Sequence, residues 1–514
     1  MVQLQAQVCV TILEVQNSYD SINKANYIDT ANVNAANAGD GIPYSVYTPK
    51  QKLAIVLVAS MASFLSPAST SAYFPALNAI GSDLGVSLQA MNWTITSYMI
   101  LQGIAPSFFS SLTDMVGRRP CYFLCLGLYI SANVALALQN NYFALLVLRC
   151  LQSTGSSATV LLGSAVIADI AATAERGTYY GYGLTTVALA PSIAPVLGGV
   201  ITQYLGWRAV FWFLTIVAGI ILICMILFYP ETSRKVVGNG SLPPQKWNVP
   251  LFTFLTGAAR QQKSSQRFDW RSMNPLRTVR LIFEKQTGVI LAYTALGYAA
   301  FYFVTAAIPG TLARVYGLND LQIGLCYIPL GAGSFLSTQM VGRAVDRNYR
   351  RLAMGLSYPI IRNRQDKLGS FPIERARLEI ALPMAYAASA AILAYGWMVQ
   401  ARLHIAGPCV VLVVIGFCNT GTINVMSTLA MDVYPKSAAT AAAAINLAKC
   451  LLGAAAAAVV QPLISALGYG WAYTVVAVIW SSASVLLLIP IRYGPKWRQE
   501  EMVVDRTQEG GASR

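Results

Sequence analysis

Long apolar segments, separated by short polar stretches, occupy most of the chain. A membrane-spanning helix needs about 20 mainly apolar residues, and twelve segments of this sequence meet that requirement. We predict helices near residues 53–76, 91–112, 120–138, 143–168, 179–204, 208–229, 287–311, 321–341, 380–400, 406–431, 437–466 and 470–492. One longer polar stretch separates the first six from the last six. The pattern therefore predicts an all-α membrane protein with twelve transmembrane helices in two six-helix halves.

A short charged motif occurs once in each half, directly after the second apolar segment. The two copies span residues 110–119 and 342–351, at an offset of 232 residues. At this offset Asp114 aligns with Asp346 and Arg118-Arg119 with Arg350-Arg351, while Gly117, Gly342 and Arg347 complete the motif. Many secondary transporters are built from two such repeats. The duplication therefore predicts that the two halves are related by pseudo-symmetry.

The apolar pattern divides the chain into two bundles, a linker and two tails. We expect the polar N-terminal tail to be disordered, and we expect both tails and the basic linker to lie in the cytosol. The boundaries are 1–50 for the N-terminal tail, 51–229 for the first bundle, 230–286 for the linker, 287–492 for the second bundle and 493–514 for the C-terminal tail.

Composition agrees with a membrane protein and limits the other function classes. Hydrophobic residues make up 55% of the chain and charged residues 11%, whereas soluble proteins have about 25% charged residues. The net charge of +15 comes mainly from loops after even-numbered segments, as the positive-inside rule requires for cytosolic loops. No aromatic-basic interleaving of the kind that binds nucleic acid is present. With a single histidine, His404, and no metal-ligand spacing, we expect neither a metal site nor a cofactor.

The first copy of the motif resembles the cytoplasmic signature of the major facilitator superfamily. It departs from that signature at Ser110, where the family has glycine, and at Met115, where the family has arginine. A carboxylate such as that of Asp114 can accept hydrogen bonds from arginine and from a helix N-terminus. Contacts of this kind can form in one conformation and separate in the other. We expect a gate here; the alternative is that these charges only set the topology.

The fifth apolar segment carries a second motif, Ala190-Pro191-Ser-Ile-Ala194-Pro195-Val-Leu-Gly198-Gly199. It resembles the antiporter motif of proton-coupled exporters, which implies exchange against protons. Small residues at every fourth position let a neighbouring helix approach closely, and Pro191 and Pro195 permit a bend. We expect this helix to act as a hinge or seal between the halves; simple helix packing is the alternative.

Two basic residues lie deep in apolar segments, where a charge costs about 3 kcal/mol and marks a functional site by default. Gln152 lies one turn after Arg149, and Lys449 lies one turn after Asn446. In the first segment, Ser66 belongs to a polar stripe that could line a cavity. No Asp or Glu lies in the middle of a predicted helix. If protons are exchanged, Lys449 is the better carrier, because arginine does not release its proton.

Taken with Gly206-Trp207-Arg208 and Pro230-Glu231-Thr232, these motifs resemble the fungal twelve-span drug:proton antiporters, in particular the quinidine-resistance and dityrosine-transporter branch. The resemblance implies the major facilitator fold and a monomeric exporter in the plasma membrane that exchanges a drug, toxin or fungal metabolite for protons. An exporter of di- or tricarboxylates is the alternative with the same fold. A membrane-embedded enzyme is disfavoured, because the sequence has no phosphate-binding loop and no His-Glu-x-x-His motif.

The gate leads to the first testable prediction. Asp114→Asn keeps the size of the side chain and removes its charge, so we expect less transport with unchanged delivery to the membrane. Transport per unit of protein in isolated membranes measures this. Normal transport by the variant at matched abundance would contradict a gating role.

Overall fold

The computed structural model describes residues 44–171, 173–242, 248–250, 282–355, 372–433, 438–490 and 492–494. Contacts divide the chain into two compact units, Met1–Val46 and Tyr47–Arg514, and all the helices of the described residues belong to the second. Most of the predicted N-terminal tail, linker and C-terminal tail lies outside the described residues.

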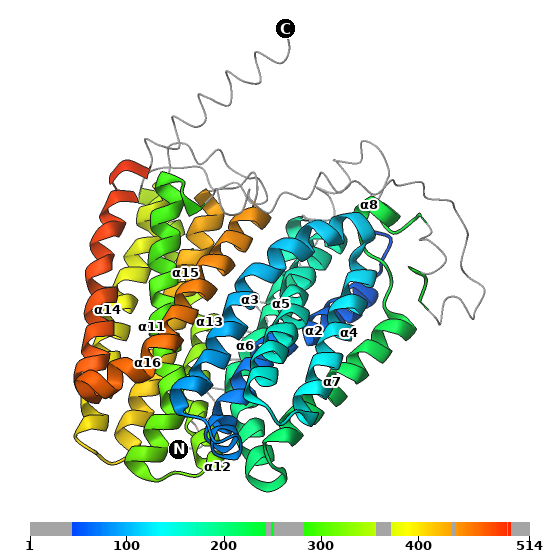
Figure 1. The fold of residues 1–514 in the computed structure, drawn as a ribbon. Coiled ribbons are helices and arrows are strands. Elements are labelled where there is room, and N and C mark those ends of the chain that lie inside the picture. Colours follow the sequence, from blue (N-terminus) through cyan, green and yellow to red (C-terminus); the bar gives the residue numbers. More distant parts are fainter. Residues whose placement is uncertain are drawn as a thin grey trace, which may run out of the picture. The chain divides into compact units, whose positions relative to one another are not determined.

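Six long helices form the N-terminal half (Figure 1). They are α2 (Pro49–Asp83), α3 (Leu88–Val116), α4 (Arg118–Leu138), α5 (Tyr142–Ile170), α6 (Thr173–Leu205) and α7 (Trp207–Phe228), followed by the short α8 (Arg234–Val237). Thr48 and Gln51 form a reciprocal capping box at the start of α2. Gly117 alone separates α3 from α4, and Gly206 separates α6 from α7; their φ angles of 107° and 82° suit glycine.

The described part of the C-terminal half also contains six long helical segments when the helix that contains Gly468 is divided at that residue. Its elements are α11 (Lys285–Tyr316), α12 (Asp320–Leu325), α13 (Tyr327–Gly355), α14 (Ile373–Gln400), α15 (Ala406–Val433), α16 (Ala438–Ala483) and the 3-10 turn η4 (Ser484–Leu487). Gly468, with a φ of 76°, divides α16 into two helical segments, which correspond to the last two predicted helices. The predicted all-α fold with two six-helix halves is confirmed.

Nine helices in the described part of the chain are long and apolar enough to cross a membrane. This set counts α16 once and does not include α3 or α13. The predicted helix at 321–341 differs from the structure at two boundaries. The helix expected at 321–341 is interrupted at Cys326, and α13 then continues to Gly355. The second copy of the charged motif is therefore helical, whereas we expected a loop between two helices.

The two ends of the bundle have different chemistry. We call the end at which α2, α4 and α6 begin the basic end, because Arg118 and Arg119 lie there, and we call the other end the opposite end. Tyr47 contacts residue Glu231 and Gly494 contacts Glu374, so both ends of the described chain in this unit lie at the basic end. Such an arrangement requires an even number of crossings, as predicted.

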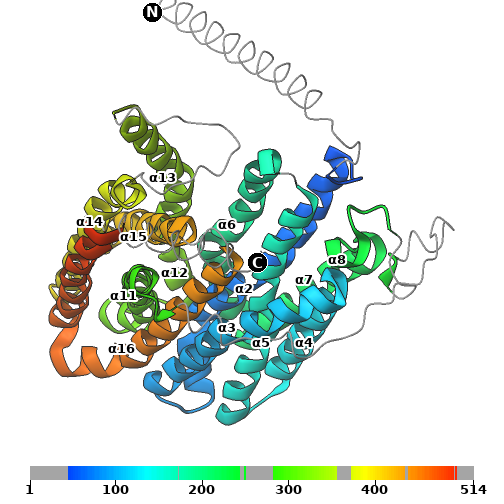
Figure 2. The same cartoon turned by 90° about the horizontal axis from the view of Figure 1, so that it is seen from above.

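The two halves contact each other along two seams. At one seam α3 lies beside α16, and at the other α6 lies beside α12 and α13 (Figure 2). Side-chain hydrogen bonds cross between the halves from Asn78 to the Pro309 carbonyl, from Thr96 to the Ala454 carbonyl and from Asn446 to the Gln102 carbonyl. These positions extend from the opposite end to about the middle of the helices.

The apolar core shows the same asymmetry. One cluster of buried residues joins the C-terminal half to the opposite-end parts of α2 and α3, including Phe74, Leu77, Ile80 and Ile95. A second cluster contains N-terminal-half residues only and includes the basic-end parts of α2 and α4. The halves therefore share a core at the opposite end, and the N-terminal half has a separate core toward the basic end.

Candidate functional site

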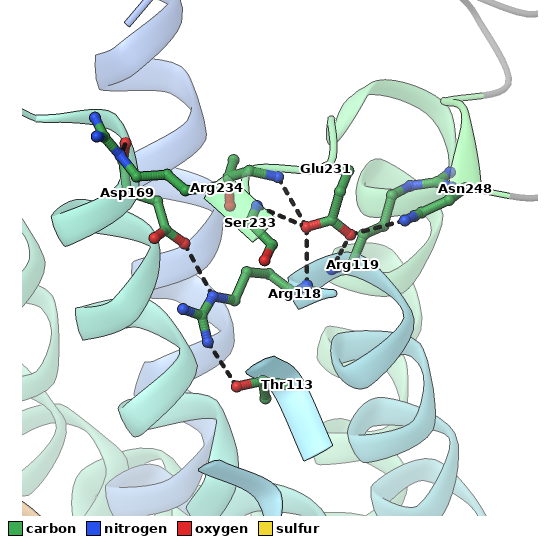
Figure 3. A network of polar contacts seen from close by, with 9 residues as sticks. Thr113, Arg118, Arg119, Asp169, Glu231, Ser233, Arg234 and Asn248 are labelled. Atoms are coloured by element: carbon green, nitrogen blue, oxygen red, sulfur yellow. Dashed lines mark hydrogen bonds and ion pairs between the residues drawn. The ribbon is translucent and has the colours of Figure 1, made fainter. Parts of the chain in front are cut away.

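The carboxylate of Glu231 anchors the basic end of the N-terminal half (Figure 3). It lies just after α7, is only 2% exposed, and accepts hydrogen bonds from the backbone N–H groups of Arg118 and Arg119 at 2.9 and 3.1 Å. These groups belong to the first turn of α4, where the helix has no side-chain cap of its own. A negative charge at this position satisfies free N–H groups and is favoured by the positive end of the helix dipole.

The remaining bonds to Glu231 come from the chain that follows it. The backbone N–H groups of Thr232 and Ser233 donate to Oε1 at 3.0 and 2.8 Å, and Asn248 Nδ2 donates to Oε2 at 2.9 Å. The first residues of the predicted linker are thus folded onto the end of α7. Burial, and secondarily the nearby charge of Glu231, raises the pKa of the Tyr47 hydroxyl to about 12, so this tyrosine stays protonated at physiological pH.

Gly117 allows the carboxylate to approach. A Cβ atom at this position would lie 2.5 Å from Oε2 of Glu231, and the backbone angles of φ 107° and ψ 168° are essentially restricted to glycine. Gly117 belongs to the charged motif that we predicted from the sequence, whereas we named Glu231 only within Pro230-Glu231-Thr232, as part of the family resemblance, and assigned it no role.

An ion pair joins the next two helices at the same end. Arg118 Nε donates to Asp169 Oδ2 at 2.9 Å, and Arg118 Nη1 donates to Thr113 Oγ1 at 2.6 Å. Arg234 Nε donates to the backbone carbonyl of Asp169 at 2.9 Å. Arg119 bonds to the carbonyl of Ile226 at 3.0 Å. Together these contacts connect α3, α4, α5, α7 and α8, and all of them lie within the N-terminal half.

The C-terminal half repeats this ion pair at a position that the sequence alignment did not predict. Arg377, in the second turn of α14, pairs with Asp432 at the end of α15 at 3.0 Å. This is the counterpart of Arg118 at the start of α4 with Asp169 at the end of α5. The alignment of Arg350-Arg351 with Arg118-Arg119 was wrong, because Arg350 and Arg351 lie within α13 and do not begin the next helix.

The other motif residues are placed as follows. Gly342, Asp346 and Arg347 are exposed on the basic-end extension of α13, and a Cβ at Gly342 would contact nothing within 4 Å. The backbone of Asp114 belongs to α3, but its side chain lies outside what the structure describes, so the gate at Asp114 stays a prediction.

Arg149 lies in the interior of the N-terminal half with no exposed surface. Its Nη1 donates to Gln152 Oε1 at 2.6 Å, and Gln152 Nε2 donates to Asn133 Oδ1 on α4 at 2.7 Å. The guanidinium carbon lies 4.0 Å from the ring centroid of Tyr73 and 4.2 Å from that of Tyr98. Two aromatic rings, from α2 and α3, thus contact the charge at cation–π distance.

Ser66 and Asn446 are brought together through a third residue. Gln102 Nε2 donates to Ser66 Oγ at 3.3 Å, while the backbone carbonyl of Gln102 accepts from Asn446 Nδ2 at 3.0 Å. Ser66 and Gln102 belong to the N-terminal half and Asn446 to the C-terminal half. Gln102, which sequence analysis did not single out, links the two.

Lys449 lies one turn beyond Asn446 on α16 and is half-buried. Its Nζ is 5.6 Å from the ring centroid of Tyr298, and Tyr298 packs on Tyr302 at 4.7 Å between centroids. Tyr302 in turn contacts Phe74 of the N-terminal half at 6.5 Å. Aromatic side chains of both halves therefore occupy the region near Lys449. That Lys449 and Arg149 face one cavity stays a prediction.

The glycines of the α6 motif pack in two directions. A Cβ at Gly198 would collide with the carbonyl oxygen of Ala72 on α2, and one at Gly199 would lie 2.7 Å from the carbonyl oxygen of Asp320 on α12. The carbonyl oxygen of Pro195 would lie 2.6 Å from a Cβ at Gly324. Pro191 is partly buried one turn earlier. This stretch of α6 is therefore in close contact with α2 on one side and with the C-terminal half on the other.

Comparison with known proteins agrees with this architecture. Residues 59–362 match the family model described as Major Facilitator Superfamily. The chain is 42% identical over 476 residues to "MFS-type transporter phiD" of Fungal sp. (strain ATCC 74256), covering 91% of this chain and 72% of that protein. It is 35% identical to "Citrate exporter 1" of Aspergillus niger, covering 90% of each chain. The crystal structure of a D-xylose-proton symporter superposes with a TM-score of 0.58 at 15% identity, covering 84% of this chain and 96% of the symporter, which indicates a shared fold.

Gly117→Ala tests the contact between Glu231 and α4. The added methyl group meets the carboxylate and forces a backbone conformation that costs about 1–3 kcal/mol for other residues, so we expect a lower melting temperature of the purified protein. Gly127→Ala is the matched control, because a Cβ at Gly127 on the same helix contacts nothing within 4 Å. Equal melting temperatures of the two variants would contradict the proposed contact.

Gly198→Leu tests the packing of α6. A branched side chain cannot fit against the backbone of α2, so we expect loss of transport. Gly219→Leu makes the same change on α7, where a Cβ contacts nothing within 4 Å, and we expect transport to persist. Both are assayed in membrane vesicles at matched abundance. Transport by the Gly198 variant equal to that of the control would show that close approach of α2 and α6 is dispensable.

Proposed function

Because this chain belongs to the major facilitator superfamily, we propose that it exports a small organic molecule by alternating access, in exchange for protons. The observation that carries this proposal is the uneven distribution of contacts between the halves. They share hydrogen bonds and an apolar core at the opposite end, whereas each ion pair described at the basic end lies within a single half. If the basic end faces the cytosol, as the loop charges predict, this conformation is the one that receives substrate from inside.

Alternating access requires that each half moves as a unit. The bonds of Glu231, Arg118 and Asp169 support this for the N-terminal half, because they connect five of its helices without involving the other half. The seams, in contrast, depend on small residues and few hydrogen bonds, which can separate at modest cost. We propose both termini in the cytosol, a location in the plasma membrane and a monomeric transport unit.

We propose two alternative substrate classes. The first is a drug, a toxin or a fungal metabolite, and the second is an organic acid. The charged residues in the predicted membrane-spanning segments favour the organic acid. Arg149 and Lys449 place positive charge in predicted membrane-spanning segments, and no Asp or Glu lies in the middle of those segments. Buried charge of one sign favours a substrate of the other sign. The similarity to "Citrate exporter 1" of Aspergillus niger supports the same substrate class.

Proton exchange needs a group that can gain and lose a proton during the cycle. Lys449 is suitable by position, because it is half-buried next to the residues that join the halves. It is also suitable by chemistry, because a lysine can release its proton whereas Arg149 stays charged throughout. Its Nζ lies 5.6 Å from the ring centroid of Tyr298, and we propose that a flat substrate stacks on the same ring. Binding of substrate and release of the proton can thus compete at one place.

Inverted vesicles from an efflux-deficient yeast test the function directly. We expect ATP-independent uptake of labelled citrate or of a lipophilic cation, driven by a pH gradient. Lys449→Met should abolish uptake, whereas Lys449→Arg keeps the charge and cannot exchange a proton, so uptake should lose its dependence on the gradient. Lys50→Met, at an exposed position, is the matched control. Gradient-dependent uptake by the Arg variant would exclude Lys449 as the proton carrier, and absence of any uptake by the wild-type chain would contradict export of these classes.

A further inference from the structure

Only one edge of the Arg149 guanidinium is used by the protein. Nη1 donates to Gln152, whereas Nε and Nη2 have no hydrogen-bond partner among the described residues, although the side chain has no exposed surface. An unpaired buried N–H group is costly, and more so when it carries charge. Two unpaired donors on one buried cation mark a site for an acceptor.

These two donors have the geometry of a carboxylate receptor. In a guanidinium group, Nε–H and one Nη2–H lie parallel in one plane and can bind the two oxygens of a carboxylate simultaneously. A lysine ammonium cannot offer this fork. None of the described ion pairs involves Arg149, so its charge has no carboxylate partner in the described part of the protein.

The surrounding residues fix the orientation of the fork. Gln152, held in turn by Asn133, fixes Nη1. The ring of Tyr73 is fixed by a 2.8 Å hydrogen bond between its hydroxyl and Thr94 Oγ1, and the hydroxyl of Tyr98 bonds to Ser156 Oγ at 3.0 Å and to the Ser66 carbonyl at 3.3 Å. Because both rings lie against the guanidinium carbon, they limit its movement.

Tyr98 also connects this site to the seam between the halves. Its hydroxyl bonds to the carbonyl of Ser66, the Ser66 hydroxyl accepts from Gln102, and the Gln102 carbonyl accepts from Asn446 of the C-terminal half. A shift of α16 against α3 thus acts on the residues that hold the Tyr98 ring. Tyr98, which lies against Arg149, is therefore linked by hydrogen bonds to a contact between the halves.

We propose that Nε and Nη2 of Arg149 bind a carboxylate group of the exported substrate as a bidentate pair, with Tyr73 and Tyr98 as positioning residues that orient and cover the fork. The inference rests on the proposed export function and makes its substrate class more specific. It requires a planar carboxylate, and it does not require a particular number of carboxylates on the substrate.

Binding to the purified full-length protein tests the proposal independently of transport. Benzoate and benzamide differ in charge but not in shape, and citrate provides a second carboxylate; tryptophan fluorescence or calorimetry gives each Kd. We expect benzoate and citrate to bind and benzamide to bind at least about tenfold more weakly, since a charge-assisted bidentate pair exceeds a neutral hydrogen bond by that factor or more.

Three variants identify the fork. Arg149→Lys keeps the charge and loses the fork, so the Kd for benzoate should rise about tenfold or more with little change for benzamide. Gln152→Glu places a carboxylate beside the guanidinium and should weaken benzoate similarly. Tyr98→Phe keeps the ring and removes its hydroxyl, which should weaken benzoate less than Arg149→Lys. Tyr122→Phe removes a buried hydroxyl elsewhere in the N-terminal half and is the control. Melting temperatures establish that each variant is folded.

The outcomes separate the two proposals. Unchanged benzoate affinity in folded Arg149→Lys and Gln152→Glu would overturn the fork while export could still stand. Failure of benzoate and citrate to bind the wild-type protein would also overturn it. Arg149-dependent binding of carboxylates by a protein that transports none of them would support the fork and contradict the export function.

Discussion

The buried carboxylate of Glu231 is the contact on which the N-terminal half depends at its basic end. It takes the place of a side-chain cap for α4 and so fixes the start of that helix against the end of α7. Gly117 makes this possible by turning the chain within one residue and leaving space for the carboxylate. Once α4 begins at this point, Arg118 is directed at Asp169, and the third and fourth helices of the half are joined. A negative charge is suited to this task, because among the described residues every hydrogen-bond partner of the Glu231 carboxylate is an N–H donor.

In the C-terminal half, different residues join the helices at the basic end. Its Arg377–Asp432 pair joins the corresponding two helices, while Asn348 on α13 bonds to Ala376 and Glu379 on α14. The ion pairs described at the basic end thus lie within single halves. A protein that opens and closes at that end gains from this arrangement, since separation of the halves does not leave these charges unpaired. At the seams, close backbone contacts at glycines such as Gly199 and Gly324 occur beside apolar side chains such as Phe74, and no described ion pair joins the halves.

The sequence alone predicts the features that the lipid bilayer requires, namely the length and number of the apolar helices. The required length of apolar segments reveals the twelve helices, and Arg149 and Gln152, which we singled out from the sequence, lie three residues apart on one helix and form a hydrogen bond of 2.6 Å. Sequence fails where partners are distant. Glu231 contacts residues 113 and 112 positions earlier, and Tyr73 and Tyr98 reach Arg149 from two other helices. The repeat alignment fails for a second reason. An alignment without gaps cannot account for a helix that continues through the motif, as α13 does to Gly355.

The positive charge of Arg149 affects the free energy of the empty protein, and it does so differently from the buried carboxylates of other transporters. Arg149 is positive in every step, because arginine does not titrate, and its burial without a carboxylate partner raises the free energy of the empty protein. An anionic substrate would relieve that cost on binding. The membrane potential would also favour its exit, since moving one charge across 100 mV is worth about 2.3 kcal/mol. For an organic anion, then, the driving force does not depend on protons alone. In that case we expect a titrating Lys449 chiefly to couple release of the substrate to return of the empty protein, and its place one turn from Asn446, which bonds to the other half, supports this expectation.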